Sequence, residues 1–429
     1  MNKKIGIIAD DLTGANDSGI QLTTKGLPTS VYFEIPDNYE NLNSGIVIDT
    51  NSRALTKEGA VSITKQVSRF LNEAGYEHIY KKMDSTLRGH IAMELMALRF
   101  VFQPEYIVVA PAFPALGRTT IDGIHYVNGE KITDTEFSKD PKHPVTTASI
   151  PKLLETDTQE KIGLLTKSDY GSNLSDFQDK LRNWKEEGIT YIVCDAEVQE
   201  DLQLAAERIS SVSKEVIWAG SAGLAEVLPS VLGFGKQSGK PVFQKSQQVL
   251  TVCGSLSQVT QNQVEYAVNQ PNVSAIEVNT MEIFDEDWNT YSKAYIEECL
   301  NELRKEKDIV LYVPSNEEIR KKVKQIGYRL NLTGNQIGEQ ISRSLGEMVT
   351  KIVDSTNRLS GFVLTGGDTA KDTSRQLGGI GFQLIKQVEA GIPLGSLIGT
   401  EREFIAVTKA GAFGKEDSIY RAMQELKGV

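Results

Sequence analysis

Short apolar runs alternate with amphipathic patterns from the start of the chain. Runs rich in Ile, Val and Tyr predict strands at residues 5–9, 30–34, 46–49, 78–83, 106–111, 191–196 and 216–220. Residues 56–75 carry apolar side chains at helical spacing, and Gly75 suits a C-terminal cap. Another helix is expected from about Ala222. Strand, helix and strand in repetition predict a mostly parallel sheet covered on both faces.

The alternation loosens between residues 111 and 161, which are rich in proline and glycine. Long loops in compact domains are usually functional or mobile. We therefore interpret the segment as a loop, part of which forms a wall of a substrate site.

A Gly-rich polar segment at residues 233–241 is the predicted domain boundary. After it the alternation starts afresh. Strands are expected at 249–253, 273–278 and 309–313 and near Phe362, Leu384 and Ile405, and helices at 258–269, 287–305 and 335–356. Because 429 residues exceed one ordinary core, we expect an α/β fold of two three-layer domains with mostly parallel sheets, residues 1–235 and 245–429, and an interdomain cleft.

The charge balance is acidic, with 46 Lys and Arg against 57 Asp and Glu, and a net charge of −11. Such a balance disfavours nucleic acid or an anionic membrane surface as the main partner. It is compatible with small anionic substrates if basic side chains gather in a pocket. The sequence does not fix the oligomeric state, and a homodimer is compatible with it.

Cysteine usage and hydropathy indicate the cellular compartment. Cys194, Cys253 and Cys299 are odd in number and widely spaced, so we expect small buried side chains rather than disulfides or a zinc site. The apolar N-terminal run meets Asp10 and Asp11 too early for a signal peptide. No apolar run is long enough to span a bilayer, and the cytoplasm is the expected location.

The residues 361–370, GFVLTGGDTA, combine a strand, two adjacent glycines and a helix start. Gly366 and Gly367 let backbone N–H groups turn toward an anion, and the helix N-terminus that follows adds its dipole. Two further strand ends, the residues 253–257, CGSLS, and 409–414, KAGAFG, offer hydroxyl groups, glycines and a cation. Together these three turns could cradle ATP. Asp368 is the candidate Mg²⁺ ligand, directly or through water, and a helix-cap role is the alternative.

A second polar cluster follows the predicted strands of the first half. Asp10 and Asp11 come after the first strand, and the residues 82–90, KMDSTLRGH, surround the end of another. Ligands of open α/β sheets gather at such carboxyl ends. The alternative is that the aspartates only cap helices and that Arg88 is a surface charge. His90, His125 and His143 show no metal-ligand spacing, so we expect them to be satisfied or on the surface.

Several common motifs are missing from the sequence. It has no Gly-x-x-x-x-Gly-Lys-Ser/Thr phosphate loop, no Gly-x-Gly-x-x-Gly after a strand, and no Gly-x-Ser-x-Gly elbow. These absences disfavour a P-loop enzyme, a nicotinamide oxidoreductase and an esterase.

Seven motifs in order along the chain together resemble the four-carbon acid sugar kinases. They are ADDLTGA at 9–15, KMDSTLRG at 82–89, PAFP at 111–114, AGSAGLA at 219–225, CGSLS at 253–257, TGGDTA at 365–370 and TKAGAFG at 408–414. The resemblance implies ATP-dependent phosphorylation of threonate, erythronate or an oxo-tetronate on its terminal hydroxyl. It implies an acid-binding N-terminal domain and a nucleotide-binding C-terminal domain.

The resemblance also assigns residues. The acid-side motifs fall on Asp10, Asp11, Lys82, Asp84, Ser85 and Arg88, and the nucleotide contacts on Ser255 or Ser257 and on Gly366, Gly367, Asp368, Thr369 and Gly411. One departure is Ala412, where a second glycine is expected.

The expected mechanism neutralises charge on the transferred group through Mg²⁺, Lys82 or Lys409, and the amides of the glycine turns. Arg88 would clamp the substrate carboxylate, and the proton acceptor is left open among Asp84, Asp10 and Asp11. Two rival hypotheses are a kinase of another polyol or keto-sugar and a non-catalytic sensor of nucleotide and sugar acid.

Overall fold

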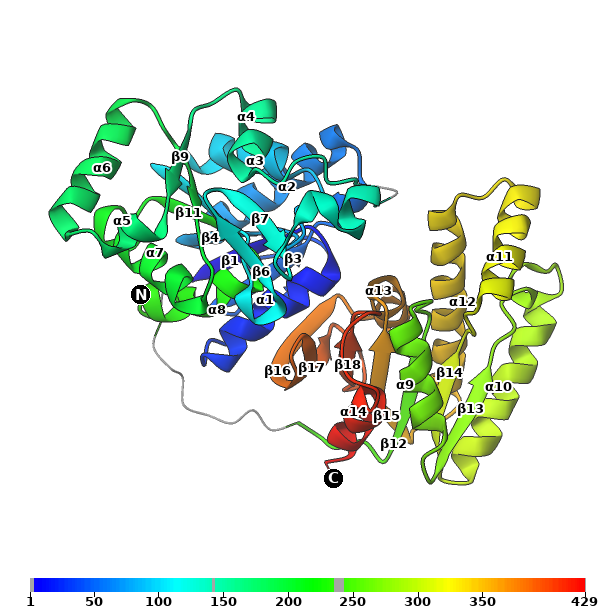
Figure 1. The fold of residues 1–429 in the computed structure, drawn as a ribbon. Helices are drawn as coiled ribbons and strands as arrows, with labels where there is room; N and C mark the ends of the chain where they lie inside the picture. Colours follow the sequence, from blue (N-terminus) through cyan, green and yellow to red (C-terminus); the bar gives the residue numbers. More distant parts are fainter. Residues whose placement is uncertain (1–3, 141–142, 235–242, 429) are drawn as a thin grey trace. The chain divides into compact units, whose positions relative to one another are not determined.

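The computed structural model describes residues 4–140, 143–234 and 243–428. The chain divides into two compact units, Met1–Ser238 and Gly239–Val429, drawn from blue to green and from green to red in Figure 1. The predicted boundary segment lies mostly outside the described residues, and so does the predicted end of the first domain at Gly235.

The strands of the first unit form a sheet whose neighbouring pairs are parallel. In spatial order they are β2 (Thr29–Tyr32), β3 (Gly45–Asp49), β1 (Ile5–Ala9), β4 (His78–Lys82), β11 (Val216–Gly220), β5 (Tyr106–Ala110), β10 (Tyr191–Cys194) and β9 (Ile162–Leu165). Each strand predicted in this half is present, with shifts of one or two residues at some ends. The strand β9 was not predicted.

Helices connect these strands. They are α1 (Leu12–Thr24), α2 (Lys57–Glu73), α3 (Ile91–Phe102), α4 (Ile150–Thr158), α5 (Lys167–Gly171), α6 (Leu174–Glu186), α7 (Gln199–Val212) and α8 (Ala222–Val231). The helix α2 shows why the local sequence is helical. Thr56 caps its first turn by accepting a hydrogen bond from the Gly59 N–H, and Gly75 follows its end with φ of +74°. Its apolar stripe, including Val67 and Leu71, is buried.

The prediction of an irregular loop over residues 111–161 was wrong in part. The strands β6 (Arg118–Ile121), β7 (Ile124–Val127) and β8 (Glu130–Lys131) form an antiparallel sheet there, and α4 follows. The reason is local turn chemistry. The pairs Asp122-Gly123 and Asn128-Gly129 have positive φ at both residues, as two-residue hairpin turns require.

The second unit has a mixed sheet. In spatial order its strands are β13 (Val273–Glu277), β14 (Asp308–Tyr312), β12 (Gln248–Cys253), β15 (Leu359–Thr365), β18 (Ile405–Lys409), β17 (Ile392–Ile398) and β16 (Gly381–Glu389). The run from β13 to β18 is parallel, whereas β17 is antiparallel to both of its neighbours. The strand β17 was not predicted.

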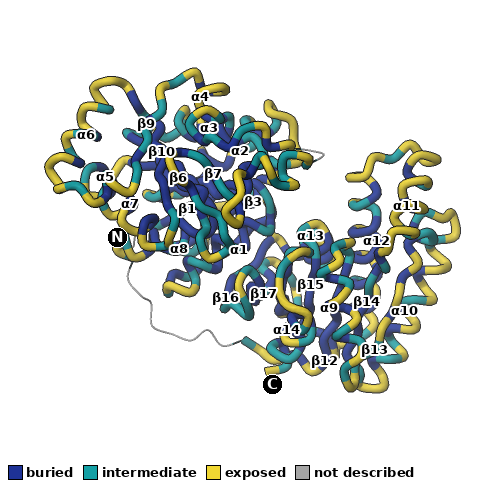
Figure 2. Tube along the Cα trace, in the orientation of Figure 1, coloured by how far each residue is buried: buried dark blue, intermediate teal, exposed yellow. Residues whose placement is uncertain are grey.

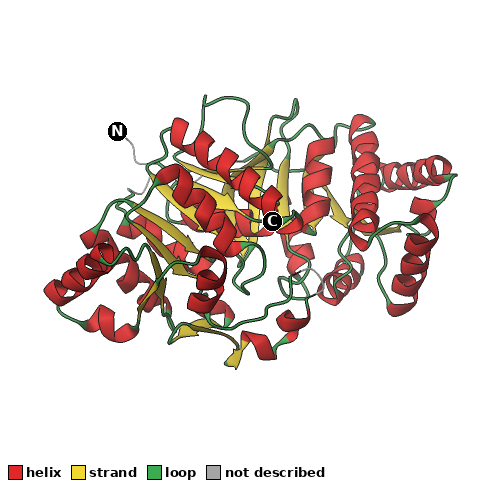
Figure 3. Cartoon of the chain, turned by 90° about the horizontal axis from the view of Figure 1, so that it is seen from above, coloured by secondary structure: helices red, strands yellow, loops and turns green. Residues whose placement is uncertain are grey.

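The helices of the second unit are α9 (Gln258–Val268), α10 (Trp288–Arg304), α11 (Glu317–Leu330), α12 (Gly334–Asp354), α13 (Gly367–Gln376) and α14 (Ser418–Lys427). Figure 3 distinguishes the helices of the chain (red) from its strands (yellow). The helix α11 was not predicted. Each of the other long helices predicted for this half is present within two residues.

The strands carry the core of each unit, as the dark blue segments of Figure 2 show. Cys194, Cys253 and Cys299 are buried free thiols, which confirms the interpretation of the cysteines. Burial raises the pKa of each thiol well above its ordinary value. No helix in the described part of the chain is long and apolar enough to cross a membrane.

Candidate functional site

The predicted acid-side residues follow adjacent strands of the first unit. In the sheet register, Ala9 at the end of β1 pairs with Asp49 of β3 and with Lys82 of β4, and Lys82 pairs with Gly220 of β11. The loops after these strands therefore begin at one edge of the sheet. This geometry brings Asp10, Asp11, Lys82 and Asp84 into one region of the unit, as the sequence predicts.

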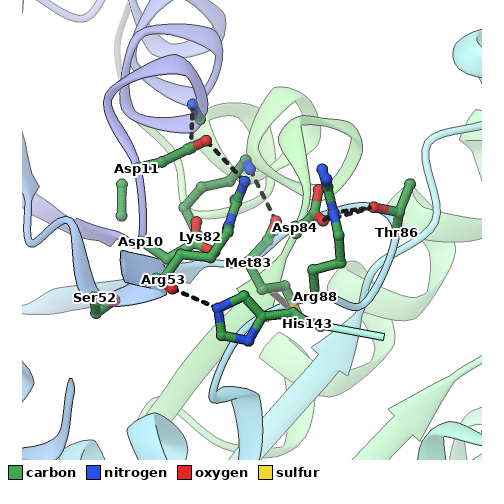
Figure 4. Close-up of polar contacts among 12 residues, drawn as sticks. Asp10, Asp11, Ser52, Arg53, Lys82, Met83, Asp84, Thr86, Arg88 and His143 are labelled. Atoms are coloured by element: carbon green, nitrogen blue, oxygen red, sulfur yellow. Dashed lines mark hydrogen bonds and ion pairs between the residues drawn. The ribbon is translucent and has the colours of Figure 1, made fainter. Parts of the chain in front are cut away.

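Asp10 and Asp11 share one arginine that sequence analysis missed (Figure 4). Arg53 donates to Asp10 Oδ2 from Nε at 2.9 Å and from Nη2 at 2.8 Å, and to Asp11 Oδ2 from Nη1 at 2.9 Å. Asp11 also caps α1, since its Oδ1 accepts from Gly14 N–H at 2.7 Å. The cap and the functional interpretation of Asp11 are thus compatible. Asp10 is 2% exposed, and its Oδ1 atom has no hydrogen-bond partner in the described residues.

The charge state of this cluster follows from its contacts. Burial alone lowers the pKa of Arg53, but the carboxylates of Asp11, Asp10 and Asp84 outweigh it and hold that pKa above its ordinary value. Arg53 lies in the short turn Ser52–Ala54 after β3. Its position beyond the carboxyl end of a predicted strand was the only sequence signal for it.

A buried chain of polar contacts anchors the turn that carries Arg53. Lys81 Nζ lies 2.9 Å from Glu94 Oε1, and their side chains are 1% and 2% exposed. The Ser52 hydroxyl donates to the same Glu94 oxygen at 2.5 Å, and Thr50 donates to the Ser52 hydroxyl at 2.9 Å. A buried ion pair on α3 and β4 therefore fixes the residue next to Arg53. Sequence analysis gave no role to Lys81 or Glu94.

Lys82 approaches the first turn of α1. Its ammonium group is buried and donates to the Met83 carbonyl at 2.8 Å. A Cβ atom on Gly14 would lie 2.7 Å from Lys82 Nζ and 2.8 Å from Asp11 Oδ1, so a side chain there would displace one of these two groups. Asp17, one turn further along α1, was also missed. Burial raises the pKa of Asp17 to about 6, with Lys82 opposing and Asp11 adding to the shift.

Asp84 and Arg88 form a second ion pair beside this cluster. Asp84 Oδ2 accepts from Arg88 Nε at 2.6 Å and from the Thr86 hydroxyl at 2.6 Å. Arg88 Nη1 also donates to Asp140 at 3.2 Å. Burial alone would raise the pKa of Asp84, but Arg53 and Arg88 outweigh it and hold that pKa well below its usual range. Arg88, predicted as a carboxylate clamp, is thus already engaged by two aspartates.

The histidines beside the site are paired with protein groups. His125 is buried and contacts Thr120 Oγ1 at 3.1 Å and the carbonyl of Ser85 at 2.8 Å. His143 Nε2 lies 2.5 Å from the Arg53 carbonyl, and His90 Nε2 lies 2.8 Å from the carbonyl of Leu55. These contacts confirm the expectation that the three are satisfied. Among the described residues, no three His, Cys, Asp or Glu side chains gather in a way that could hold a metal ion.

In the second unit, the three predicted turns begin at one level of the sheet. Cys253 at the end of β12 pairs with Thr365 of β15, and Thr365 pairs with Lys409 of β18. Gly366 has φ of +94°, and its N–H donates to the carbonyl of Lys409 at 2.9 Å. The helix α13 starts at Gly367. Its first N–H groups have no partner within the helix and are available to an anion.

The turns touch at their glycines. A Cβ atom on Gly254 would lie 2.1 Å from Thr369 Oγ1, and one on Gly411 would lie 2.3 Å from Ser255 Oγ. Neither position has room for a side chain. Ser257 joins the turns as well, because its hydroxyl donates to the Gly411 carbonyl at 2.5 Å and accepts from Thr260 N–H at 3.1 Å as the N-cap of α9.

Lys409 stabilises the turn that follows β18. It is 3% exposed, and its ammonium group donates to the carbonyls of Ala410 at 2.8 Å, Phe413 at 2.9 Å and Gly411 at 3.3 Å. Burial lowers the pKa of Lys409 to about 8. Its ammonium group thus binds the turn itself, and its assignment as a nucleotide ligand stays a prediction.

Asp368 lies in the first turn of α13, where a carboxylate suits the helix dipole. Burial raises the pKa of Asp372, one turn further on, and the charge of Asp368 adds to this shift. Mg²⁺ in nucleotide sites is usually held by one or two carboxylates together with phosphate oxygens. A single Asp368 carboxylate next to the glycine turn fits that donor set.

Comparisons with known proteins match two family models to two successive parts of the chain. Residues 5–228 match the family model of a sugar-binding N-terminal domain, and residues 250–419 that of a nucleotide-binding C-terminal domain. The chain is 30% identical to the D-threonate kinase of Salmonella typhimurium, covering 99% of this chain and 98% of that protein. It is 28% identical to the D-erythronate kinase of Heliobacterium modesticaldum, with 96% and 94% covered.

A third relative is the 3-oxo-tetronate kinase of Haemophilus influenzae, 26% identical, with 96% of this chain and 97% of that protein covered. Two solved structures share the fold. One, from Salmonella typhimurium LT2, is 23% identical with a TM-score of 0.84 and covers 98% of this chain and 99% of that one. The other, from Haemophilus influenzae, is 24% identical with a TM-score of 0.78 and covers 98% and 100%.

Proposed function

Because the chain belongs to the four-carbon acid sugar kinase family, we propose that it transfers the γ-phosphoryl group of ATP to the terminal hydroxyl of threonate, erythronate or 3-oxo-tetronate. The first unit, residues 1–235 in the sequence prediction, binds the acid. The second, residues 245–429, binds ATP.

The observation that carries this proposal is the alignment of three turns at the ends of β12, β15 and β18. Two of their glycines leave no room for a side chain, and the helix α13 begins at the turn after β15. Backbone amides at such a place neutralise phosphate oxygens without a lysine-containing phosphate loop. The nucleotide contacts proposed are Ser255, Ser257, Gly366, Gly367, Asp368, Thr369 and Gly411, with Lys409 supporting the turn.

On the acid side, the pairing of carboxylates with cations suits a hydroxylated acid. Carboxylates accept hydrogen bonds from substrate hydroxyls, and cations hold the substrate carboxylate. Asp10 Oδ1, which has no hydrogen-bond partner among the described residues, offers one buried acceptor. Arg53 joins Lys82, Ser85 and Arg88 as a substrate-binding residue in the proposal.

The pKa directions narrow the choice of proton acceptor. A general base works best when its pKa lies near the working pH. Since Arg53 and Arg88 hold the pKa of Asp84 well below its usual range, Asp84 is better suited to orient the acceptor hydroxyl than to take its proton. Asp10 and Asp11 remain the candidates for that step. In-line transfer also requires that acid and nucleotide come together and that water is excluded, so the proposal includes closure of the units on their substrates.

Mg²⁺, when bound at Asp368, would neutralise charge on the β- and γ-phosphates. The residues of this chain bind and orient the two reactants. Lys82, close to Asp11 and α1, places positive charge beside the acid hydroxyls. The α13 amides do the same for the phosphates.

A coupled assay of ADP release tests the proposal. We expect ADP release with ATP and at least one four-carbon sugar acid from a panel of threonate, erythronate and 3-oxo-tetronate, and none with pentoses or neutral polyols. Activity on a polyol or keto-sugar alone would support the rival kinase. Saturable binding of ATP and an acid without ADP would indicate a sensor and would overturn the proposal.

A further inference from the structure

The second unit contains a cavity of about 440 Å³ beside its nucleotide turns. It lies between α11, α12 and the loop after β12. Its apolar walls include Leu256, Ile319, Val323, Ile337 and Ile341. The volume falls in the range of small-molecule sites. Neither the proposed phosphate contacts nor the acid cluster uses it.

We infer that this cavity holds the purine base of the nucleotide, an inference that rests on the proposed function. Its position relative to the phosphate turns is the first support. Leu256 lines the cavity and stands between Ser255 and Ser257. A Cβ atom on Gly366 would lie 3.7 Å from the Cβ of Ser255, so the residue next to Leu256 lies close to the diglycine turn.

The helix α12 gives a second, independent link. Ile341 lines the cavity, while the next residue, Ser342, has its hydroxyl 3.4 Å from that of Thr369 in the first turn of α13. Consecutive residues of α12 therefore line the cavity and contact the first turn of α13. A nucleotide whose phosphates face α13 can therefore extend its base toward α11.

The chemistry of the lining suits a flat heterocycle with a polar edge. Apolar side chains cover the faces of a base, and a few polar groups fix its orientation. Thr280 lines the cavity and is 1% exposed, yet its hydroxyl has no partner among the described residues. A buried hydroxyl without a partner is costly. A ring nitrogen or exocyclic amino group of a purine would satisfy it.

Arg320 completes the lining as a fixed planar group. Its Nε donates to the Ser315 hydroxyl at 3.0 Å, and its Nη2 donates to the carbonyl of Leu256 at 2.9 Å. These bonds hold the guanidinium at the cavity next to the turn. A guanidinium held in this way can stack on an aromatic ring.

A filling substitution tests the inference. In Val323→Trp the indole would occupy the cavity from α11. The matched control is Leu330→Trp, which adds the same group at the end of the same helix, where Leu330 is 43% exposed. Binding of ATP and of inorganic tripolyphosphate is measured by calorimetry for both variants. Tripolyphosphate probes the turns without a base.

We expect Val323→Trp to weaken ATP binding by at least about tenfold and to leave tripolyphosphate and sugar-acid binding unchanged, with Leu330→Trp like the wild type. Unchanged ATP affinity in a folded Val323→Trp protein would overturn the inference. So would an equal loss for ATP and tripolyphosphate, because the effect would then not concern the base.

If Val323→Trp does not fold, Thr280→Val decides the matter, because valine keeps the shape of threonine and removes only the hydroxyl. Weaker ATP binding with unchanged tripolyphosphate binding supports the inference, and wild-type ATP binding overturns it. Failure of the proposed function is a separate result, since the wild type would then show no ATP-dependent phosphorylation of any acid in the panel.

Discussion

Replacing Glu94 by glutamine would leave the ammonium group of Lys81 buried without its counter-charge. Lys81 Nζ and Glu94 Oε1 are 2.9 Å apart, and both side chains are almost fully buried. At an effective dielectric constant of about 20, their attraction is about 6 kcal/mol. Breaking a buried pair costs about 3–5 kcal/mol in measured cases. Glutamine keeps an oxygen for the Ser52 hydroxyl, so the change isolates the charge. We expect Glu94→Gln to lower the free energy of unfolding of the first unit by about 3–5 kcal/mol.

Urea unfolding followed by tryptophan fluorescence measures this loss. A Trp288→Phe background leaves Trp184 and Trp218, both in the first unit, as reporters. The control is Asp179→Asn, which breaks an exposed pair with Arg182 in the same unit and should cost less than about 1 kcal/mol.

The double variant Lys81→Met with Glu94→Leu removes both charges, and it should be clearly more stable than Glu94→Gln alone. A loss within about 1 kcal/mol for Glu94→Gln, or equal losses in the single and double variants, would refute the reasoning.

Three further predictions follow from the sites. Since the pKa of Asp17 is raised from 3.8 to about 6, its contribution to stability is present below pH 4 and lost as pH rises through 6. Between pH 4 and pH 8, the free energy of unfolding of Asp17→Asn, measured in urea, should therefore rise by up to about 3 kcal/mol relative to that of the wild type. Parallel pH profiles of the two proteins would contradict this. Gly411→Val should weaken ATP binding at least about tenfold without changing acid binding in calorimetry, because the added Cβ meets Ser255 Oγ. The control is Gly338→Ala, since Gly338 has open space around it. Equal ATP affinities of Gly411→Val and the wild type would refute the nucleotide site. Because the pKa of Lys409 is about 8, ATP affinity should fall between pH 7 and pH 9 as the ammonium group loses its proton. Lys409→Met should bind ATP more weakly and without that pH dependence. The same pH profile in both proteins would exclude a role of the Lys409 charge in ATP binding.

Hydrophobic patterning was enough to place the parallel strands other than β9. The strands β1 and β11 match the prediction at both ends, because a continuous apolar run bounded by polar or glycine residues has few other solutions. The turn at Gly366 was recognisable because its signal, two glycines between a strand and a helix start, also lies within a few consecutive residues. The antiparallel hairpins were missed because the prolines in the same segment indicate a loop. The Asp122-Gly123 and Asn128-Gly129 pairs, which are typical of hairpin turns, were the signal for them.

Arg53 shows what sequence patterns do not contain. Apart from its position after a predicted strand, nothing in the residues around it distinguishes it from a surface arginine. Its contact with Asp10 spans 43 positions of the chain and exists only because β3 lies beside β1. The same holds for Glu94 on α3, whose partner Lys81 lies on the strand β4. Roles that depend on such tertiary contacts require coordinates.

The close approach of Gly254 to Thr369 and of Gly411 to Ser255 links the turn after β12 to the turns after β15 and β18. Any enlargement at either glycine would have to be matched by a smaller partner in the adjoining segment. The three segments should therefore tolerate change in pairs rather than singly during divergence. A loop transplanted alone from another kinase is expected to fail here, whereas the full set of three could be exchanged together.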